Sequence, residues 1–199
     1  MILKGVVVVR KLLLIGERIY LETLTTKVSA KTLQENINDF DQTRYMHEVP
    51  YPYTLEDAES YIKYLNSIKD DSCIELGIFN RNTDDFIGVV SLSNINYQYE
   101  NGEIGYWIRK KFWNKGYTKE AAQMLIRYAF QELKLTRIYA TLQKENTGSL
   151  ALLTSLGFQV EGLMRKSVKN KGKLVDRYMC SLLREEYDDT HENAQKIIV

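Results

Sequence analysis

Apolar residues recur along this chain with two different periods, and the periods separate helices from strands. Between residues 118 and 133 the apolar side chains fall three and four positions apart, which is typical of a helix that buries one face. Residues 73–79 and 86–92 are short, dense apolar runs, and the polar residues 80–85 between them suit a hairpin turn. The pattern predicts antiparallel strands first and a long helix after them.

The same reasoning places the other elements. Thr54 follows the proline-containing loop 50–53 and can cap a helix, with Asp57 answering it three residues later. After a loop around Asn101 and Gly102, residues 105–108 are predicted as β structure, 138–142 as a strand, 147–156 as a short helix that Gly157 ends, and 158–183 as a hairpin turning near residues 170–172. This order predicts a mixed α+β sheet, in which ligands usually bind where a strand runs into a helix.

The two ends of the chain differ from the part between them. Residues 1–15 contain two apolar runs, 6–9 and 12–15, which Arg10 and Lys11 separate. Neither run approaches the roughly 20 apolar residues of a membrane span, so we expect an N-terminal extension of one or two strands, the alternative being an artificial or mis-started extension. An open edge at residues 6–9 favours pairing with a second chain as a homodimer. Residues 188–199 are expected to form a polar C-terminal tail that frays, which leaves residues 16–187 as one domain.

Composition narrows the class of protein. The chain has 199 residues, a formal net charge of +1 and 44% hydrophobic residues, which are values of a single globular domain and exclude wholesale disorder. The near-zero net charge gives no general reason to expect nucleic acid or a membrane as the main partner. The two cysteines, Cys73 and Cys180, cannot make a disulfide framework and no spacing indicates zinc, so we expect no metal and a reducing cytoplasm.

The junction at residues 113–121 is the most informative part of the chain. A strand enters it, a turn with a single glycine, Gly116, follows, and the predicted amphipathic helix leaves. Backbone N–H groups at a helix start lack intrahelical partners and carry the positive end of the helix dipole, and Lys115 adds charge. Only glycine takes a positive φ or lets a phosphate approach the backbone without strain. The junction indicates an anion pocket, although a turn that merely starts a helix would look the same, and the GxxxxGK[ST] loop of ATP-binding proteins is absent.

Four motifs in this order resemble the GNAT acetyltransferases, and within them the ribosomal-protein N-terminal acetyltransferases of the RimJ/RimL type. They are residues 102–108 (GEIGYWI), 113–121 (WNKGYTKEA), 145–149 (ENTGS) and 156–158 (LGF). Residues 18–22 and the loop 50–53 resemble the first strand and the substrate-side loop of that family, so the resemblance covers roughly residues 16–187.

The resemblance implies a GNAT fold: a central, mixed, mostly antiparallel twisted sheet that is flanked by helices and splays at the acetyl-CoA site. It implies that the pantetheine arm pairs with the backbone of Tyr106, Trp107 and Ile108, and that the pyrophosphate lies on the backbone amides of Asn114, Lys115, Gly116, Tyr117 and Thr118. The family pattern Q/R-x-x-G-x-G/A is altered here, because Trp113 stands at its first position and Thr118 at its last. The tryptophan removes a polar side chain, whereas the threonine can cap the helix but narrows the space near the phosphate.

Two residues are expected to act on the reacting groups. Acetyl transfer needs a neutral amine, and Glu103 is the candidate base, acting through water. Its alternative role is that of a solvated residue at the start of a strand. Ser149 lies where the family places a hydroxyl beside the sulfur, and Asn146 can cap the short helix and bond the cofactor; their alternative role is capping alone. Because a thiol has a pKa near 8.5, Ser149 is expected to donate a hydrogen bond rather than to be a true acid.

The acceptor is expected to be a protein N-terminal α-amine, whose pKa of about 7.7–8.0 leaves part of it neutral at pH 7. Tyr51 and Tyr53 would wall its pocket, or would simply pack their loop onto the domain. A polyamine or an aminoglycoside is the alternative acceptor, since residues 48–59 carry acidic side chains that favour cations. A further alternative is a non-catalytic module that holds acetyl-CoA, or that docks on the ribosome or RNA through the basic residues 165–173, which otherwise form a solvated hairpin tip.

Overall fold

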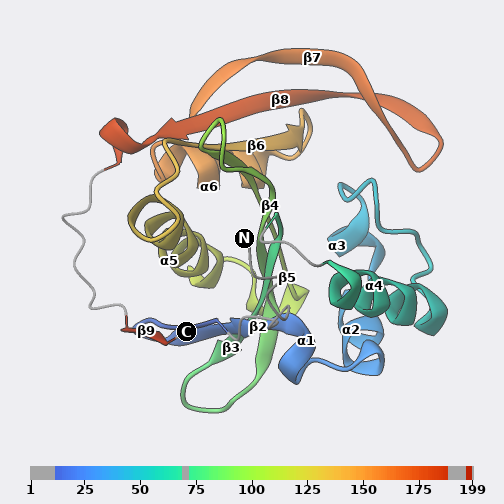
Figure 1. Ribbon diagram of the computed structural model, residues 1–199. Coiled ribbons are helices and arrows are strands. Elements are labelled where there is room, and N and C mark those ends of the chain that lie inside the picture. The colour runs from blue at the N-terminus through green and yellow to red at the C-terminus, as the bar shows by residue number, and fades with distance from the viewer. Residues whose placement is uncertain (1–11, 69–71, 188–195, 199) are drawn as a thin grey trace, which may run out of the picture.

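The computed structural model describes residues 12–68, 72–187 and 196–198, which form one nine-stranded sheet with helices on both faces (Figure 1). The strands lie in the order β7-β8-β6-β5-β4-β3-β2-β1-β9. Their bounds are β1 Leu13–Ile15, β2 Ile19–Thr23, β3 Ile74–Asn80, β4 Phe86–Asn96, β5 Asn101–Ile108, β6 Arg137–Gln143, β7 Gln159–Asn170, β8 Lys173–Leu183 and β9 Lys196–Ile198. The helices are α1 Leu24–Lys27, α2 Ala30–Ile37, α3 Phe40–Thr43, α4 Leu55–Ser67, α5 Tyr117–Gln131 and α6 Thr147–Ser155, with short 3₁₀ helices η1 Lys110–Phe112 and η2 Arg184–Glu186.

Neighbouring strands of this sheet run antiparallel except for β5 and β6. The parallel pairing is short: residues 101–103 pair with residues 137–139 and the register goes no further, while β5 stays paired with β4 as far as Ile108. The two strands therefore separate beyond Glu103. This confirms the predicted α+β architecture, a mixed and mostly antiparallel sheet with a splay in its middle.

Side chains alternate between the two faces of a strand, and the central strands consequently feed two cores. The first core lies under α5 and α6 and includes Leu76, Val90 and Leu92, all with no exposed surface. The second lies under α1, α2 and α4 and includes Phe79 and Phe86. Figure 1 shows α5 and α6 on one face of the sheet and α1 to α4 on the other.

The predicted helix signals are confirmed where they fix the ends of α4 and α5. Thr54 accepts a hydrogen bond from the Asp57 amide at 3.2 Å, and the Asp57 carboxylate accepts one from the Thr54 amide at 2.8 Å, which is the expected reciprocal cap. The apolar stripe of α5 is buried as predicted. The helix ends at Gln131, so Leu133, the last residue of the predicted stripe, packs on the core from just beyond it.

One turn lies elsewhere than predicted. Asn101 and Gly102 were expected in a loop, but both belong to β5, and the turn occupies residues 97–100 instead. Asn101 pairs with Asn96 of β4 and with Arg137 of β6, and this pairing on both sides extends the strand. A polar Asn-Gly pair is thus tolerated inside a strand that has neighbours on each edge.

The first and last strands of the described residues, β1 and β9, pair at one edge of the sheet. Leu13–Ile15 forms β1 on β2, in line with an added strand, while the apolar run 6–9 lies outside the described residues. The expectation of a fraying tail is wrong for Lys196–Ile198, which pairs antiparallel with β1 as β9, because β1 offers an open edge that a short apolar segment can fill. Within the described ranges no helix is long and apolar enough to span a bilayer.

Candidate active site

The splay between β5 and β6 opens into a cavity of about 680 Å³. Residues 104–108 of β5 line one side, residues 140–142 of β6 the other, and the start of α6 closes one end. Of the sequence-predicted site residues, the cavity collects Tyr106, Trp107, Ile108, Asn114, Gly116, Thr118, Asn146 and Ser149. Segments far apart in the sequence thus meet because two adjacent strands stop pairing.

One end of the cavity is the start of α5. Gly116 has φ of 79° and Asn114 has φ of 58°, both in the left-handed region, where glycine and asparagine are the most tolerant residues. The first amide to donate into the helix is that of Glu120, to the Gly116 carbonyl at 3.1 Å. The amides of residues 117–119 therefore precede the first closed turn and point out of the helix start, which makes this end suited to an anion.

A clamp that the sequence did not reveal holds this turn. The Arg18 guanidinium donates to the Lys115 carbonyl at 2.9 Å and to the Glu120 carboxylate at 2.8 Å, and the other Glu120 oxygen accepts from the Arg18 amide at 2.8 Å. The same guanidinium lies 4.9 Å from the centre of the Tyr117 ring. Lys115 and Tyr117 accordingly support the turn from outside the cavity, and their side chains do not line it. An arginine 97 residues away in sequence leaves no local signal for this contact.

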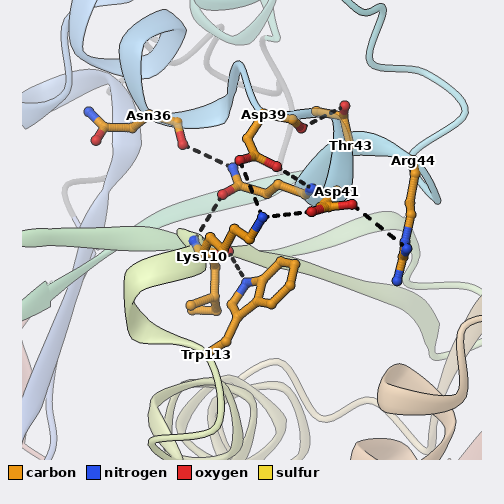
Figure 2. A network of polar contacts seen from close by, with 9 residues as sticks. Asn36, Asp39, Asp41, Thr43, Arg44, Lys110 and Trp113 are labelled. Atoms are coloured by element: carbon orange, nitrogen blue, oxygen red, sulfur yellow. Dashed lines mark hydrogen bonds and ion pairs between the residues drawn. The ribbon is translucent and has the colours of Figure 1, made fainter.

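The opposite wall comes from the short helix α3, and Figure 2 shows how it is fastened to the segment after β5. Gln42 is buried, donates to the Asn36 carbonyl at 2.9 Å and accepts from the Lys110 amide at 3.1 Å. The Lys110 ammonium lies 2.6 Å from the Asp41 carboxylate, and the Trp113 indole donates to the Ile108 carbonyl at 2.7 Å. Trp113, which replaces the polar first residue of the family pattern, is therefore used to fix the chain between β5 and α5.

At the α6 end, two hydroxyl groups meet. The Tyr106 and Ser149 oxygens are 2.7 Å apart, and either can be the donor. Burial raises the pKa of Tyr106 to about 12, so its hydroxyl stays protonated across the physiological range. Asn146 caps α6 by accepting from the Ser149 amide at 3.2 Å, and both residues line the cavity. Asn146 and Ser149 can therefore cap the helix and still contact a ligand in the cavity.

Glu103 lies where the parallel pairing of β5 and β6 ends, next to the cavity rather than in its lining. Its two carboxylate oxygens accept hydrogen bonds from the Thr141 hydroxyl at 2.8 Å and the Asn94 side-chain Nδ2 at 3.1 Å. Thr141 does line the cavity, and its oxygen also accepts from Arg177 at 3.1 Å. Glu103 is thus held in a polar network one side chain away from the cavity, not simply solvated at a strand start.

The two tyrosines of the proline-containing loop do not line the cavity. Tyr53 is buried in the second core, its amide donates to Asn38 at 3.0 Å, and burial raises its pKa to about 12. Tyr53 therefore packs the loop onto the domain, which is one of the two predicted alternatives. Tyr51 is exposed and packs edge-on against Phe40.

The basic hairpin tip reaches over to the same loop region. Asn170 donates to the Arg44 carbonyl at 2.6 Å, and the Lys171 ammonium donates to the carbonyls of Met46 and Val49. Burial lowers the pKa of Lys171. The hairpin joining β7 and β8 therefore closes over the α3 side of the molecule (Figure 1), and Lys171 is not a free solvated cation at its tip.

These features match a known family. A sequence model described as the acetyltransferase (GNAT) domain matches residues 18–159. This chain belongs to the GNAT acetyltransferase family. The uncharacterized N-acetyltransferase p20 of Bacillus licheniformis is 38% identical over 176 residues, which covers 86% of this chain and 98% of that protein. The solved structure of a GNAT-family acetyltransferase from Bacillus anthracis superposes with a TM-score of 0.74 at 27% identity, over 87% of this chain and 99% of that one.

Two further relatives carry a substrate in their names. The putative ribosomal N-acetyltransferase YdaF of Bacillus subtilis is 38% identical over 101 residues, which is 51% of this chain and 55% of that protein. The spermidine N(1)-acetyltransferase of Escherichia coli strain K12 is 26% identical over 162 residues, which is 81% of this chain and 84% of that protein. Family membership makes this GNAT protein an acetyl-CoA-dependent N-acetyltransferase, and both acceptor types occur among its relatives.

The cavity fits acetyl-CoA on its own features. The splayed β5 edge offers backbone groups that β6 no longer pairs, and the start of α5 offers outward amides under a glycine with positive φ. Gly105 lines the cavity, and a Cβ there would lie 2.9 Å from the Ser91 hydroxyl, so a side chain could enter only by displacing that group. The cavity thus combines an end suited to an anion with a strand edge whose backbone groups β6 does not pair.

Proposed function

We propose that this GNAT protein is of the RimJ/RimL type and transfers acetyl directly to a protein N-terminal α-amine in a ternary complex. The observation that carries the proposal is the placement of Glu103, at the end of the β5–β6 pairing and beside the cavity, and of Ser149, on α6 and in the cavity lining. In this proposal the backbone of residues 106–108 binds the pantetheine arm, and the amides of residues 114–118 bind the pyrophosphate.

Bound acetyl-CoA supplies the thioester that is attacked. The neutral amine nitrogen forms a bond to the acetyl carbonyl carbon and the carbon–sulfur bond breaks. The nitrogen then loses a proton to solvent, and the departing CoA thiolate takes one up from solvent to become the thiol. Glu103, acting through water held by Thr141, accepts the proton from the ammonium form of the acceptor. An α-amine with a pKa of about 7.7–8.0 needs only modest help of this kind.

Ser149 assists the leaving sulfur by hydrogen bonding. The Tyr106 hydroxyl, 2.7 Å away and protonated at neutral pH, can donate to Ser149 and so orient the Ser149 proton toward the cavity. A thiol pKa near 8.5 makes the thiolate a tolerable leaving group, for which a donor suffices. Tyr106 was predicted for its backbone alone, and its side chain adds this support.

The test is release of CoA from acetyl-CoA against peptides beginning with Ser, Ala or Met, spermidine and an aminoglycoside, with mass spectrometry of the products. A single acetyl group on the α-amine of one peptide class is the expected result. Turnover of the small amines alone would overturn the proposed acceptor while leaving the cavity assignment intact.

A polyamine is the second candidate acceptor. The spermidine acetyltransferase relative aligns over 81% of this chain, against 51% for the ribosomal relative. This broader coverage supports a polyamine as the acceptor. The acidic side chains on the substrate side are only partly available, because Asp57 is used in the cap of α4 whereas Glu48 is exposed. We further propose a cytoplasmic location and a homodimer; contact of the basic hairpin with RNA is a weaker proposal, since Lys171 is engaged within the chain.

A further inference from the structure

We propose that Glu75, held by Tyr61, is an acceptor-binding residue of this enzyme: a second carboxyl group that attracts the cationic form of the acceptor amine toward Glu103. The inference rests on the proposed transfer to an amine, but not on whether that amine belongs to a peptide or a polyamine. It assigns binding to Glu75 and leaves proton transfer to Glu103.

The placement of Glu75 follows from strand register. Glu75 of β3 lies opposite Ser91 of β4, and Ser91 lies opposite Gly105 of β5. Directly opposed residues in antiparallel strands face the same side of the sheet, so these three form one row across it, which we call the polar row. Gly105 lines the cavity, and Glu103, two residues earlier on β5, faces the same side. With strands about 4.8 Å apart, Glu75 stands about 10 Å from the cavity edge at Gly105.

The residues of the polar row keep partial exposure although they lie on the central strands. Glu75, Ser91 and Gly105 are all partly exposed, and so is Tyr61 of α4 above them. Gly105 adds no side chain to the row, and the Ser91 hydroxyl occupies the space that a Cβ at Gly105 would need. The helices α1 to α4 therefore leave these residues partly exposed, and in this proposal the acceptor reaches the cavity along the polar row.

The Glu75 carboxyl is held by a hydrogen bond, and no cation is among the described titratable groups that act on it. The Tyr61 hydroxyl donates to one of its oxygens at 2.5 Å. Cys73, Tyr53 and Glu48 are the other titratable groups acting on this pair, and none of them is a cation. A carboxyl with a fixed orientation and no cationic partner among these groups is suited to bind an ammonium group from a ligand.

The loop at residues 46–48 links the polar row to the cavity. Met46 lines the cavity and also packs against the second core, and Glu48, two residues later, acts electrostatically on Glu75. Burial raises the pKa of Glu75 to about 7, and Glu48 pushes it in the same direction. Approach of a cation would favour the ionised carboxylate, so acceptor binding and proton release from Glu75 are coupled.

The experiment measures equilibrium binding of spermidine and of a Ser-starting peptide to the CoA-saturated protein by calorimetry, beside the steady-state constants for any acceptor that turns over. Glu75→Gln should weaken binding of the preferred acceptor at least about tenfold at pH 8, with the KM for acetyl-CoA unchanged. For wild type the acceptor affinity should rise between pH 6 and 8 more than for Glu75→Gln. Tyr61→Phe, which keeps the carboxyl but frees it, should weaken binding less.

Glu35→Gln is the matched control, since Glu35 is exposed on α2 at the same side of the sheet and pairs only loosely with Lys31 at 3.8 Å. Equal acceptor binding by wild type and Glu75→Gln would overturn the inference, as would failure of wild type to bind either probe. Absence of turnover despite Glu75-dependent binding would instead count against the proposed catalysis and support the inference, so the two failures are distinguishable.

Discussion

The two faces of the central strands carry opposite kinds of residue at adjacent positions. On the face under α5, Leu76, Val90 and Leu92 have no exposed surface. One residue away on the same strands, Glu75 and Ser91 face the other side and stay partly exposed. Alternation thus gives these strands a sealed face under α5 and, on the other side, a stretch around the polar row that stays partly exposed, which we call the open face.

The difference arises from what covers each face. The helix α5 lays an apolar stripe directly on the sheet, whereas α1, α2 and α4 pack around Phe79 and Phe86, and α4 contacts the polar row through the Tyr61 hydroxyl. The polar row runs from Glu75 to Gly105, which lines the cavity. Substitutions on the sealed face should therefore change unfolding free energy, and those on the open face or in the cavity should change binding and turnover.

The largest effect should come from the sealed face. Leu92→Ala removes a fully buried side chain that packs near Gly102, and should lower the free energy of unfolding by about 3 kcal/mol. Urea unfolding measures this, with Ser91→Ala as the neighbouring control that should cost less than about 1 kcal/mol. Similar losses for the two variants would mean that the faces do not differ in the way described.

The next effect tests the anion-binding end. Gly116→Asp places a carboxylate at the start of α5, where it repels phosphate, and a Cβ there lies 3.2 Å from the Arg18 guanidinium. Acetyl-CoA affinity should fall at least about a hundredfold by calorimetry. Gly116→Asn has the same size and tolerates the positive φ without the charge, so it should retain much more affinity. Unchanged affinity in the Asp variant would show that the pyrophosphate does not bind here.

The sequence predicted the sealed face better than the open one, for a physical reason. The stripe of α5, the cap at Thr54 and the glycine at 116 are local signals, and the structure has each of them in place. The Arg18 clamp and the polar row depend on strand order and register, which bring together residues with no periodic relation in the chain. Tyr53 illustrates the converse, since a tyrosine near a loop gives no sign whether it will line a pocket or fill a core.

A smaller effect should separate Glu103 from the cofactor site. Glu103→Gln keeps the shape and the bond from Thr141, and should lower kcat about tenfold near pH 7 with the KM for acetyl-CoA unchanged. The loss should shrink above pH 8.5, because an α-amine with a pKa of about 8 is then neutral without a base. A loss that stays constant across this range in a pH–rate profile would point to a structural role for Glu103.

The smallest effect concerns the titration of Glu75, a residue of the open face. The pKa of Glu75 is raised from 4.5 to about 7 by burial, so the folded protein holds a proton that the unfolded chain has already released between these values. The unfolded state binds fewer protons there, and this group's contribution to stability therefore falls as pH rises from 4.5 through 7. Glu75→Gln lacks the titration, and its unfolding free energy relative to wild type should increase from pH 5 to pH 8 by at least about 1 kcal/mol, since one pKa unit corresponds to about 1.4 kcal/mol. Chemical unfolding at both pH values measures this difference, and Glu35→Gln is a control that should show no such change. A difference that does not vary with pH would mean that Glu75 is ionised in the folded enzyme at both values, with its charge solvated in the absence of an acceptor.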